Sequence, residues 1–337
     1  MVFISGRETN PYFNLAAEEY LLECGTGDVF LLWQNRPSVI IGKNQNAYAQ
    51  LNLSFMEDHG ILAARRLTGG GAVFHDLGNV NFTFITDAPT RREIDFERFA
   101  VPIAEVLQKL GVPAVLDGRN DLLADGRKIS GNAQCVYPAG DGRQRLLHHG
   151  TLLFSADLSC LGGALHVDRE KMESKGIQSV ESRVANIRDL PQYRGPDTVE
   201  GFLDALTEAA AVRYGAPRGY TPKEAAAIQE LADKKYSTWD WIFGKSGAYS
   251  ITRERRFAFG TVSVSLNADK GVIRQITFGG DYFGIKDTER LADRLIGCRL
   301  EEAALTAALA ECADYIHGST GGQIAELILG KKTGEAL

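Results

Sequence analysis

The stretch RRLTGGGAVFHDLGN, residues 65–79, places three consecutive glycines between a pair of arginines and a His-Asp pair. Ordering three glycines is costly, because glycine loses more backbone freedom on folding than any other residue. A glycine-rich turn offers successive N–H groups that can converge on phosphate or carboxylate oxygens, and the planar fork of arginine suits the same anions. We therefore predict an anion-binding loop at 69–71 rather than a simple turn between strands.

The common nucleotide motifs do not fit this loop. A dinucleotide fingerprint needs a third glycine where Phe74 stands. Residues 244–246 supply the GKS that ends a Walker loop, but Trp239 stands where its first glycine belongs. A nucleotide would therefore bind this loop through a different backbone arrangement.

Three apolar segments near the loop predict strands. NVNFTFIT (79–86) alternates apolar and polar side chains, which is typical of a half-buried strand. VFLLWQN (29–35) and SVIIGKNQN (38–46) are apolar runs joined by Arg36 and Pro37. We expect these two runs to pair as neighbouring strands around a short turn.

Two helices and a hairpin are also predicted in this half of the chain. NLAAEEYLLEC (14–24) has helical spacing with Asn14 as its N-cap, and residues 96–111 form an amphipathic pattern that ends at a glycine. Residues 121–134 hold two strand-like runs around Ala124-Asp125-Gly126. Because Asp-Gly is a turn signal, we expect a hairpin there.

The second half of the chain has a different pattern of predicted secondary structure. Residues 165–245 are mainly helical in pattern, residues 257–281 predict two strands, and 288–297 and 302–318 predict two helices. A chain of 337 residues is longer than one core usually grows. We expect an α+β domain at 1–245 and a small α+β module at 250–337.

Composition limits the class of protein. Net charge is −6 and the sequence pI is about 5.6, which argues weakly against nucleic acid as the main partner. Five widely spaced cysteines without a CxxC favour a reducing compartment over a disulfide framework. The N-terminus lacks a signal-peptide pattern, and no apolar run reaches the length of a membrane span. We expect a soluble cytoplasmic protein.

A second segment that contains candidate functional residues is GRNDLLADGRKISGNAQ (118–134). Lys128 stands early in a β-type run, and Ser130 and Gly131 after it would let a ligand approach closely. Asp121 is a candidate ligand for Mg²⁺, which favours one or two carboxylates together with phosphates. The alternative is a solvated lysine and an ordinary turn.

The remaining reactive residue types give weaker signals. HHGTLLFS (148–155) predicts a strand, on which His148 and His149 point to opposite faces and cannot share a metal. One of them is expected to line a pocket. Cys135 has no neighbour that marks an activated thiol, so we interpret it as a small buried side chain.

Four separated segments together resemble the lipoate–protein ligase A family: RRLTGGGAVFHDLGN, GRND (118–121), GRKISGNAQ (126–134) and HHGTLL (148–153). GKNQN (42–46) and the glutamates at 18–19 also match. The resemblance covers essentially the whole chain, and the C-terminal module is similar to the accessory domain of the two-domain bacterial ligases. One departure is the Gln134-Cys135 pair, where some members carry an arginine two residues after an SGxA segment.

This resemblance implies a large catalytic domain like those of biotin and lipoate ligases, with mixed sheets and flanking helices. It also implies a reaction in two steps. Lipoate and MgATP would give lipoyl-AMP and pyrophosphate, and the lipoyl group would then pass to a lysine of an acceptor protein. The implied acceptors are lipoyl domains of 2-oxoacid dehydrogenase E2 subunits and the glycine-cleavage H protein. A monomer without nucleic-acid or membrane partners is expected.

The resemblance also implies roles for individual residues. Lys128 matches the lysine that touches both ATP and lipoate, and Asp121 is the candidate magnesium ligand. The remaining matches to the ATP or adenylate site are Arg66, Gly71, Ala72, Val73 and Phe74. The matches to the lipoate pocket are Trp33, Gly70, His75 and His149.

Three alternatives stay open at the level of sequence. An octanoyl or lipoyl transferase of the same superfamily would use a cysteine thioester and no ATP, but its cysteine usually precedes the lysine motif, whereas Cys135 follows it. A biotin protein ligase would carry a different arginine-glycine loop. A non-catalytic lipoate-binding protein could keep the fold, although Lys128 argues against it.

Overall fold

The computed structural model describes residues 1–25, 27–88, 95–117, 120–165, 184–246, 249–282 and 286–331. The chain forms two compact units. The N-terminal unit comprises Met1–Lys43 and Ile61–Thr238, and the C-terminal unit comprises Asn44–Gly60 and Trp239–Leu337. The segment 44–60 thus belongs with the C-terminal unit, although it lies early in the sequence. No helix in the described ranges is long and apolar enough to cross a bilayer.

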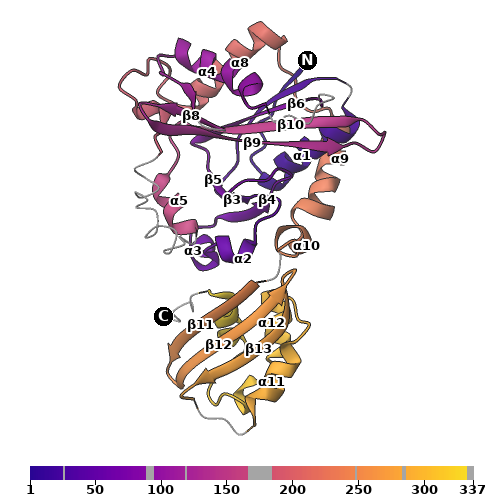
Figure 1. The fold of residues 1–337 in the computed structure, drawn as a ribbon, viewed down its shortest axis with the longest axis vertical. Coiled ribbons are helices and arrows are strands. Elements are labelled where there is room, and N and C mark those ends of the chain that lie inside the picture. Colours follow the sequence, from indigo (N-terminus) through magenta and orange to yellow (C-terminus); the bar gives the residue numbers. More distant parts are fainter. Residues whose placement is uncertain are drawn as a thin grey trace. The chain divides into compact units, whose positions relative to one another are not determined.

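A seven-stranded sheet organises the N-terminal unit (Figure 1). Its strands in spatial order are β1 (Val2–Ser5), β2 (Val29–Trp33), β6 (Asn79–Asp87), β10 (Gln144–Leu153), β9 (Arg127–Pro138), β8 (Asp121–Ala124) and β7 (Val115–Asp117). The β1–β2 pair is parallel and the other pairs are antiparallel.

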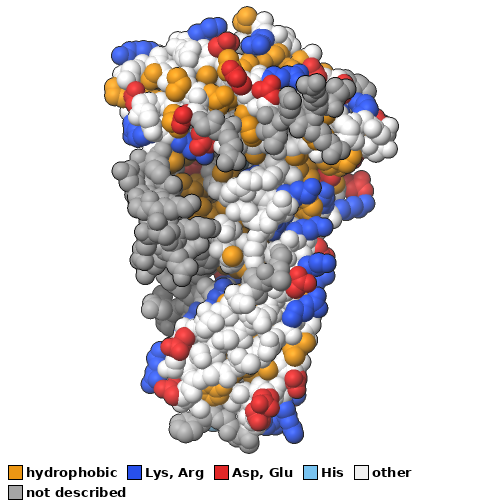
Figure 2. Space-filling view, in the orientation of Figure 1, with side chains coloured by type: hydrophobic (Ala, Val, Ile, Leu, Met, Phe, Trp, Pro, Cys, Tyr) orange, Lys and Arg blue, Asp and Glu red, His pale blue; other side chains and the backbone are white. Residues whose placement is uncertain are grey.

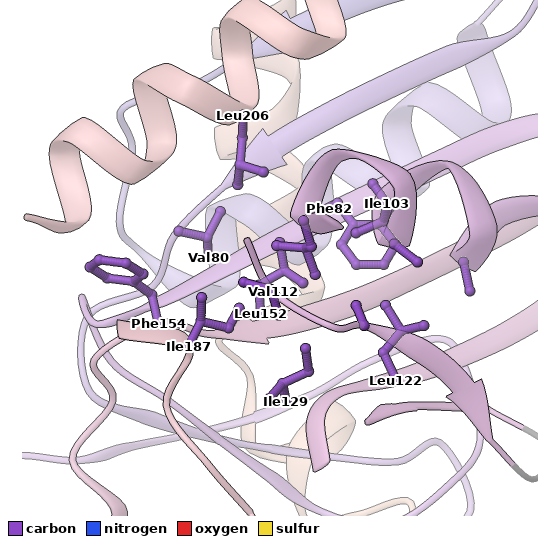
Figure 3. Packing of buried hydrophobic residues seen from close by; sticks show 14 of the residues in the cluster. Val80, Phe82, Ile103, Val112, Leu122, Ile129, Leu152, Phe154, Ile187 and Leu206 are labelled. Carbon is purple, nitrogen blue, oxygen red and sulfur yellow. The ribbon is translucent and has the colours of Figure 1, made fainter. Parts of the chain in front are cut away.

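Two helices, α4 (Glu97–Lys109) and α8 (Val199–Tyr214), cover one face of this sheet (Figure 1). Figure 3 shows Ile103 of α4 and Leu206 of α8 with Phe82 of the sheet in the buried core. Each fully buried side chain of this size contributes about 1.5–3 kcal/mol through removal of apolar surface from water. The hydrophobic effect therefore fixes these helices on the sheet and leaves the opposite face for other groups.

A three-stranded sheet lies on that opposite face. It has the order β4 (Leu62–Arg65), β3 (Ser38–Ile41), β5 (Val73–His75), and it is accompanied by α1 (Pro11–Cys24) and α5 (Leu158–Ala164) (Figure 1). The predicted pairing of 29–35 with 38–46 is wrong, because β2 pairs with β1 and β6 whereas β3 pairs with β4 and β5. Both runs are buried throughout, so apolar pattern alone could not assign them to separate sheets.

Two further expectations need correction. Helix α1 begins at Pro11 with Asn10 as its N-cap, and Asn14 lies inside the helix, where its amide donates to Gln34 O at 2.8 Å. Strand β6 is buried on both faces rather than half-buried, because its polar face lies beneath the site described below. In both cases polar side chains make contacts that depend on the tertiary structure. The local sequence pattern does not show such contacts.

Other predicted elements are confirmed. Helix α4 matches 96–111, and Asp125 and Gly126 form the β8–β9 turn with φ of 49° and 71°. Strand β10 holds both histidines, with His148 packed among phenylalanines of the helix-covered face. The predicted helices after 165 are confirmed by α8, by α9 (Pro222–Leu231) and by a π-helical turn at Ala232–Tyr236; residues 166–183 lie outside the described ranges.

The C-terminal unit is a second α+β body. Strands β11 (Tyr249–Phe257), β12 (Gly260–Asp269) and β13 (Val272–Gly280) form an antiparallel sheet. Its helices are α2 (Ala47–Gln50), α3 (Leu53–Asp58), α10 (Trp239–Ile242), α11 (Thr288–Leu295), α12 (Glu302–Ala308) and α13 (Gly321–Leu329). The expected helix 302–318 ends at Ala308, and the described chain contains a third strand and α13 that the sequence pattern did not predict.

The open face of the β11–β13 sheet carries mostly uncharged polar side chains, with charged ones toward its margins (Figure 2). Ser250 and Asn267 are hydrogen-bonded across the strands, as are Thr252 and Ser265. The opposite face packs the apolar side chains of this unit against its helices. This alternation is what an antiparallel sheet with one solvated face requires.

Tyr48 of the inserted segment lies in the core of the C-terminal unit, and its hydroxyl donates to the Leu300 carbonyl. We expect Tyr48→Phe to lower the free energy of unfolding by about 1 kcal/mol, because a buried hydrogen bond is lost. Urea unfolding measures this change. Tyr282→Phe is the control, since the Tyr282 hydroxyl bonds to none of the described residues. Equal effects of both substitutions would contradict the assignment of Tyr48 to this core.

Candidate functional site

A cavity opens on the face of the seven-stranded sheet opposite α4 and α8. Its volume is about 160 Å³, far more than the roughly 10–15 Å³ that one water needs, so it suits a small-molecule ligand. The lining residues that carry the following argument are Trp33, Arg66, His75, Asn81, Lys128 and His149. All belong to the N-terminal unit.

One row of residues crosses the sheet beneath the cavity. Asp121 of β8 pairs with Gly131 of β9, whose N–H donates to Thr151 Oγ1 of β10 at 3.2 Å. Thr151 pairs with Asn81 of β6, and Asn81 pairs with Trp33 of β2. Residues directly opposite one another in a sheet point to the same face. The row therefore has a charged end at β8–β9 and an aromatic end at β6–β2.

Lys128 supplies the cation at the charged end. Its Nζ lies 2.9 Å from Asp121 Oδ1, and both side chains are about one-third exposed. Gly131 makes room for this ammonium, because a Cβ built on Gly131 would lie 2.8 Å from Nζ. Sequence reasoning placed Lys128 and Asp121 in one segment, and the structure brings them into contact.

Asp121 also fits the chemistry of a magnesium ligand. Its Oδ1 is buried and, although Lys128 is close enough for an ion pair, accepts no well-formed hydrogen bond from the described residues. Mg²⁺ commonly takes one or two protein carboxylates and completes its shell with phosphate oxygens and water. A single carboxylate with a free lone pair is therefore compatible with that ion, and Asp121 would hold it.

The glycine loop is held from behind by Arg66, whose side chain is only 5% exposed. Its guanidinium donates to the carbonyls of Ile40 (2.9 Å), Gly69 (2.7 Å) and Gly71 (2.7 Å) and to Thr68 Oγ1 (2.9 Å). Four of the five N–H groups of this arginine are thus used, two on carbonyls of the loop and two on Thr68 and Ile40 beside it. The guanidinium thus fixes the backbone beside the cavity, and the contact with phosphate that we expected of Arg66 stays a prediction.

The N–H groups of the loop are not used inside the described part of the protein. Gly70 adopts φ of 91°, a conformation that strains residues with a Cβ, and Gly71 also lines the cavity. No hydrogen bond joins the N–H groups of residues 69–72 to acceptors in the described part of the chain. Such a set of unpaired amides beside a cavity is compatible with an anion, and the anion-binding role that we expect of the loop stays a prediction.

A buried hydrogen-bond chain connects the loop to the aromatic end of the cavity. Thr68 Oγ1 accepts from Arg66 and is also hydrogen-bonded to His149 Nε2 at 2.8 Å. His149 Nδ1 then donates to Glu18 Oε1 at 2.9 Å. Glu18 also accepts from Thr83 Oγ1, which accepts from the Trp33 indole. This chain fixes the orientation of both Trp33 and His149 against the cavity.

His75 enters the cavity from the small sheet. Burial, with Arg66 and His149 nearby, lowers the pKa of His75 to about 3, so the ring is neutral near pH 7. The Asn35 amide accepts from Asn14 through Oδ1 and donates through Nδ2 to His75 Nδ1 at 3.0 Å. The proton of the neutral ring must therefore sit on Nε2.

The structure brings most of the predicted residues together. Trp33, Arg66, Gly70, Gly71, Ala72, Val73, His75, Lys128 and His149 all line the cavity. Phe74 differs, since its side chain turns into the core at 6% exposure while its backbone pairs with Val39. His148 lies on the other face of β10, as the strand pattern predicted. The roles assigned to these residues remain predictions.

Sequence analysis gave no role in the site to Glu18, Thr68, Asn81 and Thr151, although Glu18, Thr68 and Thr151 lie in segments that match the family. The alternation of β6 put Asn81 on a polar face, but without the cavity that face was interpreted as solvated. Thr68 and Glu18 are entirely buried and act through His149, so only tertiary contacts identify them.

Cys135 does not have the surroundings of a nucleophile. Burial, with Glu18 as a secondary cause, raises the pKa of its thiol to about 12. A thiolate is the reactive form of cysteine, and this environment suppresses it near neutral pH. The interpretation of Cys135 as a packed side chain without a catalytic role is therefore favoured.

Two buried histidines make stability depend on pH. Burial lowers the pKa of both His75 and His148 to about 3, against 6.5 for the free side chain. Between these values the unfolded chain takes up protons that the folded chain refuses, so stability falls as pH falls from about 6.5 toward 3. We expect the free energy of unfolding to drop by about 1 kcal/mol per histidine between pH 7 and pH 5.5. Urea unfolding at the two pH values measures this loss.

His148→Phe should remove about half of that loss, because the ring stays apolar and no proton is taken up. His59→Gln is the control, since His59 is exposed. A stability that is flat between the two pH values, or a loss that His148→Phe leaves unchanged, contradicts the assignment.

Comparison with known proteins agrees with this geometry. Residues 10–211 match the lipoyl protein ligase A/B catalytic domain, and residues 246–328 match the bacterial lipoate protein ligase C-terminus. The chain is 38% identical over 312 residues to the lipoate-protein ligase LplJ of Bacillus subtilis, covering 90% of this chain and 92% of that one.

Three solved structures share the fold of the N-terminal unit. A bipartite lipoate protein ligase of Thermoplasma acidophilum, described with its E2 lipoyl domain, has a TM-score of 0.61 at 29% identity and covers 73% of this chain and 97% of its own. Protein Ta0514 of the same organism, with bound lipoic acid, has a TM-score of 0.56 at 26% identity, covering 72% and 98%. A lipoate-protein ligase A bound with ATP has a TM-score of 0.57 at 28% identity, covering 73% and 100%. With a catalytic-domain match over more than half of its length, this chain belongs to the lipoate–protein ligase family.

Proposed function

We propose that this protein activates lipoate with ATP to form lipoyl-AMP and then transfers the lipoyl group to a lysine of an acceptor protein. The observation that carries this proposal is the polarity of the cavity floor. Lys128 and Asp121 stand at one end of the row and Trp33 at the other, with the unpaired amides of the glycine loop alongside. An acyl carboxylate with an apolar tail matches this gradient.

The first step joins two anionic groups. A carboxylate oxygen of lipoate attacks the α-phosphorus of ATP, the bond to the bridging oxygen breaks, and pyrophosphate leaves with that electron pair. Negative charge builds up on the phosphorus oxygens in the transition state, and fixed positive charge and oriented N–H groups stabilise it most effectively. Lys128 Nζ and the amides of residues 69–72 supply these groups.

The second step moves the acyl group to an amine. A neutral lysine amine of the acceptor attacks the carbonyl carbon of lipoyl-AMP, AMP leaves, and the amine loses a proton as the amide forms. Lys128 stabilises the carbonyl oxygen and the departing phosphate in turn. No covalent intermediate with the enzyme is needed, which agrees with the suppressed thiol of Cys135.

We assign Mg²⁺ to Asp121, where it would neutralise charge on the phosphates of ATP. The buried Oδ1, which accepts no well-formed hydrogen bond from the described residues although Lys128 lies close to it, supports this assignment. Lys128 contacts the same carboxylate, so binding of the nucleotide would draw the ammonium toward the phosphates. We propose lipoyl domains of 2-oxoacid dehydrogenase E2 subunits and the glycine-cleavage H protein as acceptors, because one related ligase is described with its E2 lipoyl domain.

Pyrophosphate release with purified protein, ATP and lipoate tests the proposal, with a lipoyl domain added as acceptor. Lys128→Ala should lower lipoate-dependent release by about 100-fold or more, because the fixed cation at the reacting centre is lost. Cys135→Ala should keep both pyrophosphate release and the mass gain on the acceptor.

The rival functions predict different results in that assay. A transferase would acylate the acceptor from an acyl-protein donor without ATP and would fail with Cys135→Ala. A non-catalytic binder would retain lipoate but release no pyrophosphate. Either result would overturn the proposed function.

A second prediction concerns the space above Gly131. Gly131→Ala places a methyl group against the Lys128 ammonium, which is the mobile end of a side chain and can move away without strain. We therefore expect about 100-fold slower turnover, since a misplacement of about 1 Å at a reacting centre costs that much, with little change in melting temperature. Gly219→Ala is the control, because no atom lies within 4 Å of its added Cβ. Full activity of Gly131→Ala would show that the observed placement of Lys128 is not the productive one.

A further inference from the structure

Two buried nitrogen atoms at the aromatic end of the cavity have no hydrogen-bond partner in the described residues: Nε2 of His75 and Nδ2 of Asn81. Both residues line the cavity, and both are at least nine-tenths buried, with exposures of 4% and 1%. A buried polar group without a partner usually costs stability or marks a functional contact. Neither nitrogen is used in the steps derived above.

Both nitrogens are hydrogen donors in this arrangement. The Asn14–Asn35 chain leaves the His75 proton on Nε2, as derived above. Asn79 Nδ2 donates to Asn81 Oδ1 at 2.9 Å, so Asn81 presents its amino group as the unsatisfied half of the amide. The ligand atom that meets them must therefore be an acceptor.

The same ligand atom must also pack favourably against the apolar side chains that surround the two nitrogens. The His75 ring lies edge-on to the Trp33 ring, with centroids 6.0 Å apart, and Asn81 is the cross-strand partner of Trp33. Leu15 and Ile40 line the cavity as well. Sulfur in a thioether or disulfide combines weak acceptance with a polarisable, apolar surface that packs favourably on aromatic rings.

The distance along the row agrees with such a ligand. Lys128 Nζ stands over Gly131 of β9, and Asn81 lies two strands away on β6. Two strand spacings amount to about 10 Å, which is the span of a medium-length acyl chain between its carboxyl group and its far end. When the carboxyl group is at Lys128, the far end therefore reaches His75 and Asn81.

We propose that His75 and Asn81 form a sulfur-recognition subsite, which reads the dithiolane ring of the substrate and makes the enzyme prefer lipoate to a sulfur-free acid of the same shape. This inference rests on the proposed function for the identity of the substrate. Lipoate gives an acceptor to both N–H groups, whose nitrogen atoms are buried and without a partner in the described residues. A hydrocarbon tail would leave both N–H groups buried and unpaired, and sites with polar groups reject analogues that lack the matching atom.

Three acids separate the contribution of sulfur from that of ring shape. They are lipoate, cyclopentanevalerate, in which CH₂ groups replace both sulfurs, and octanoate, which has neither sulfur nor ring. Calorimetry gives the Kd of each acid for the purified full-length protein, and pyrophosphate release gives each kcat/KM. We expect both sulfur-free acids to bind about tenfold more weakly than lipoate, because weak sulfur contacts are worth up to about one such factor together.

Two variants locate the preference. His75→Phe keeps an aromatic ring and removes the Nε2 donor, and Asn81→Leu keeps the volume and removes the amide. Each should lower affinity for lipoate, leave or improve affinity for cyclopentanevalerate, and so bring the ratio toward one. Ile40→Val is the matched control, because it alters the same cavity wall without touching a polar atom and should affect all three acids alike. Melting curves verify that each variant folds.

The outcomes separate this inference from the proposed function. Equal Kd values for lipoate and cyclopentanevalerate in the wild type overturn the sulfur subsite, even when lipoate-dependent pyrophosphate release proves the ligase activity. A preference for lipoate that survives both His75→Phe and Asn81→Leu also overturns it. If no acid supports pyrophosphate release, the proposed function fails, and the Kd ratios still decide whether the subsite recognises sulfur.

Discussion

The site depends on the burial of one guanidinium. Arg66 donates to two carbonyls of the glycine loop, to the carbonyl of Ile40 and to Thr68. Burial lowers the pKa of Arg66 to about 10, so it remains charged near pH 7 and its bonds remain charge-assisted. The carbonyls of Gly69 and Gly71 are tied to Arg66, and the loop N–H groups have no partner in the described residues. Through Thr68 the same cation orders His149, so one side chain positions both the glycine loop and His149.

The seven-stranded sheet gives the pocket a charged end and an aromatic end. Five strands contribute one residue each to a single row, because paired residues of adjacent strands point to the same face. The row begins with the Lys128–Asp121 pair and ends at Trp33, so a ligand with one anionic end has only one favourable orientation. On the opposite face, α4 and α8 bury the apolar side chains that keep the strands in register. Hydrophobic packing on one face of the sheet therefore keeps the cavity-lining residues of the other face in position.

Sequence pattern predicted elements well where the signal was local. The Asp125–Gly126 turn, α4 and the opposite orientations of His148 and His149 follow from turn chemistry, amphipathic spacing and strand alternation. It failed where two buried runs could pair in more than one way. Strands β2 and β3 are uniformly apolar and close in sequence, yet they belong to different sheets. A run of hydrophobic residues indicates that a strand is buried, but it does not indicate which strand pairs with it.

The sequence by itself determined the family and predicted the glycine loop and the lysine segment as parts of the site, since glycine content and side-chain order are properties of the chain. Only the tertiary structure decided that Arg66 holds the loop, that Gly131 makes room for Lys128, and that Glu18 and Thr68 orient His149. It also placed two unpaired N–H groups beside Trp33. Each of these depends on which distant segments pack together, and hydrogen bonds between residues far apart in sequence have no local pattern.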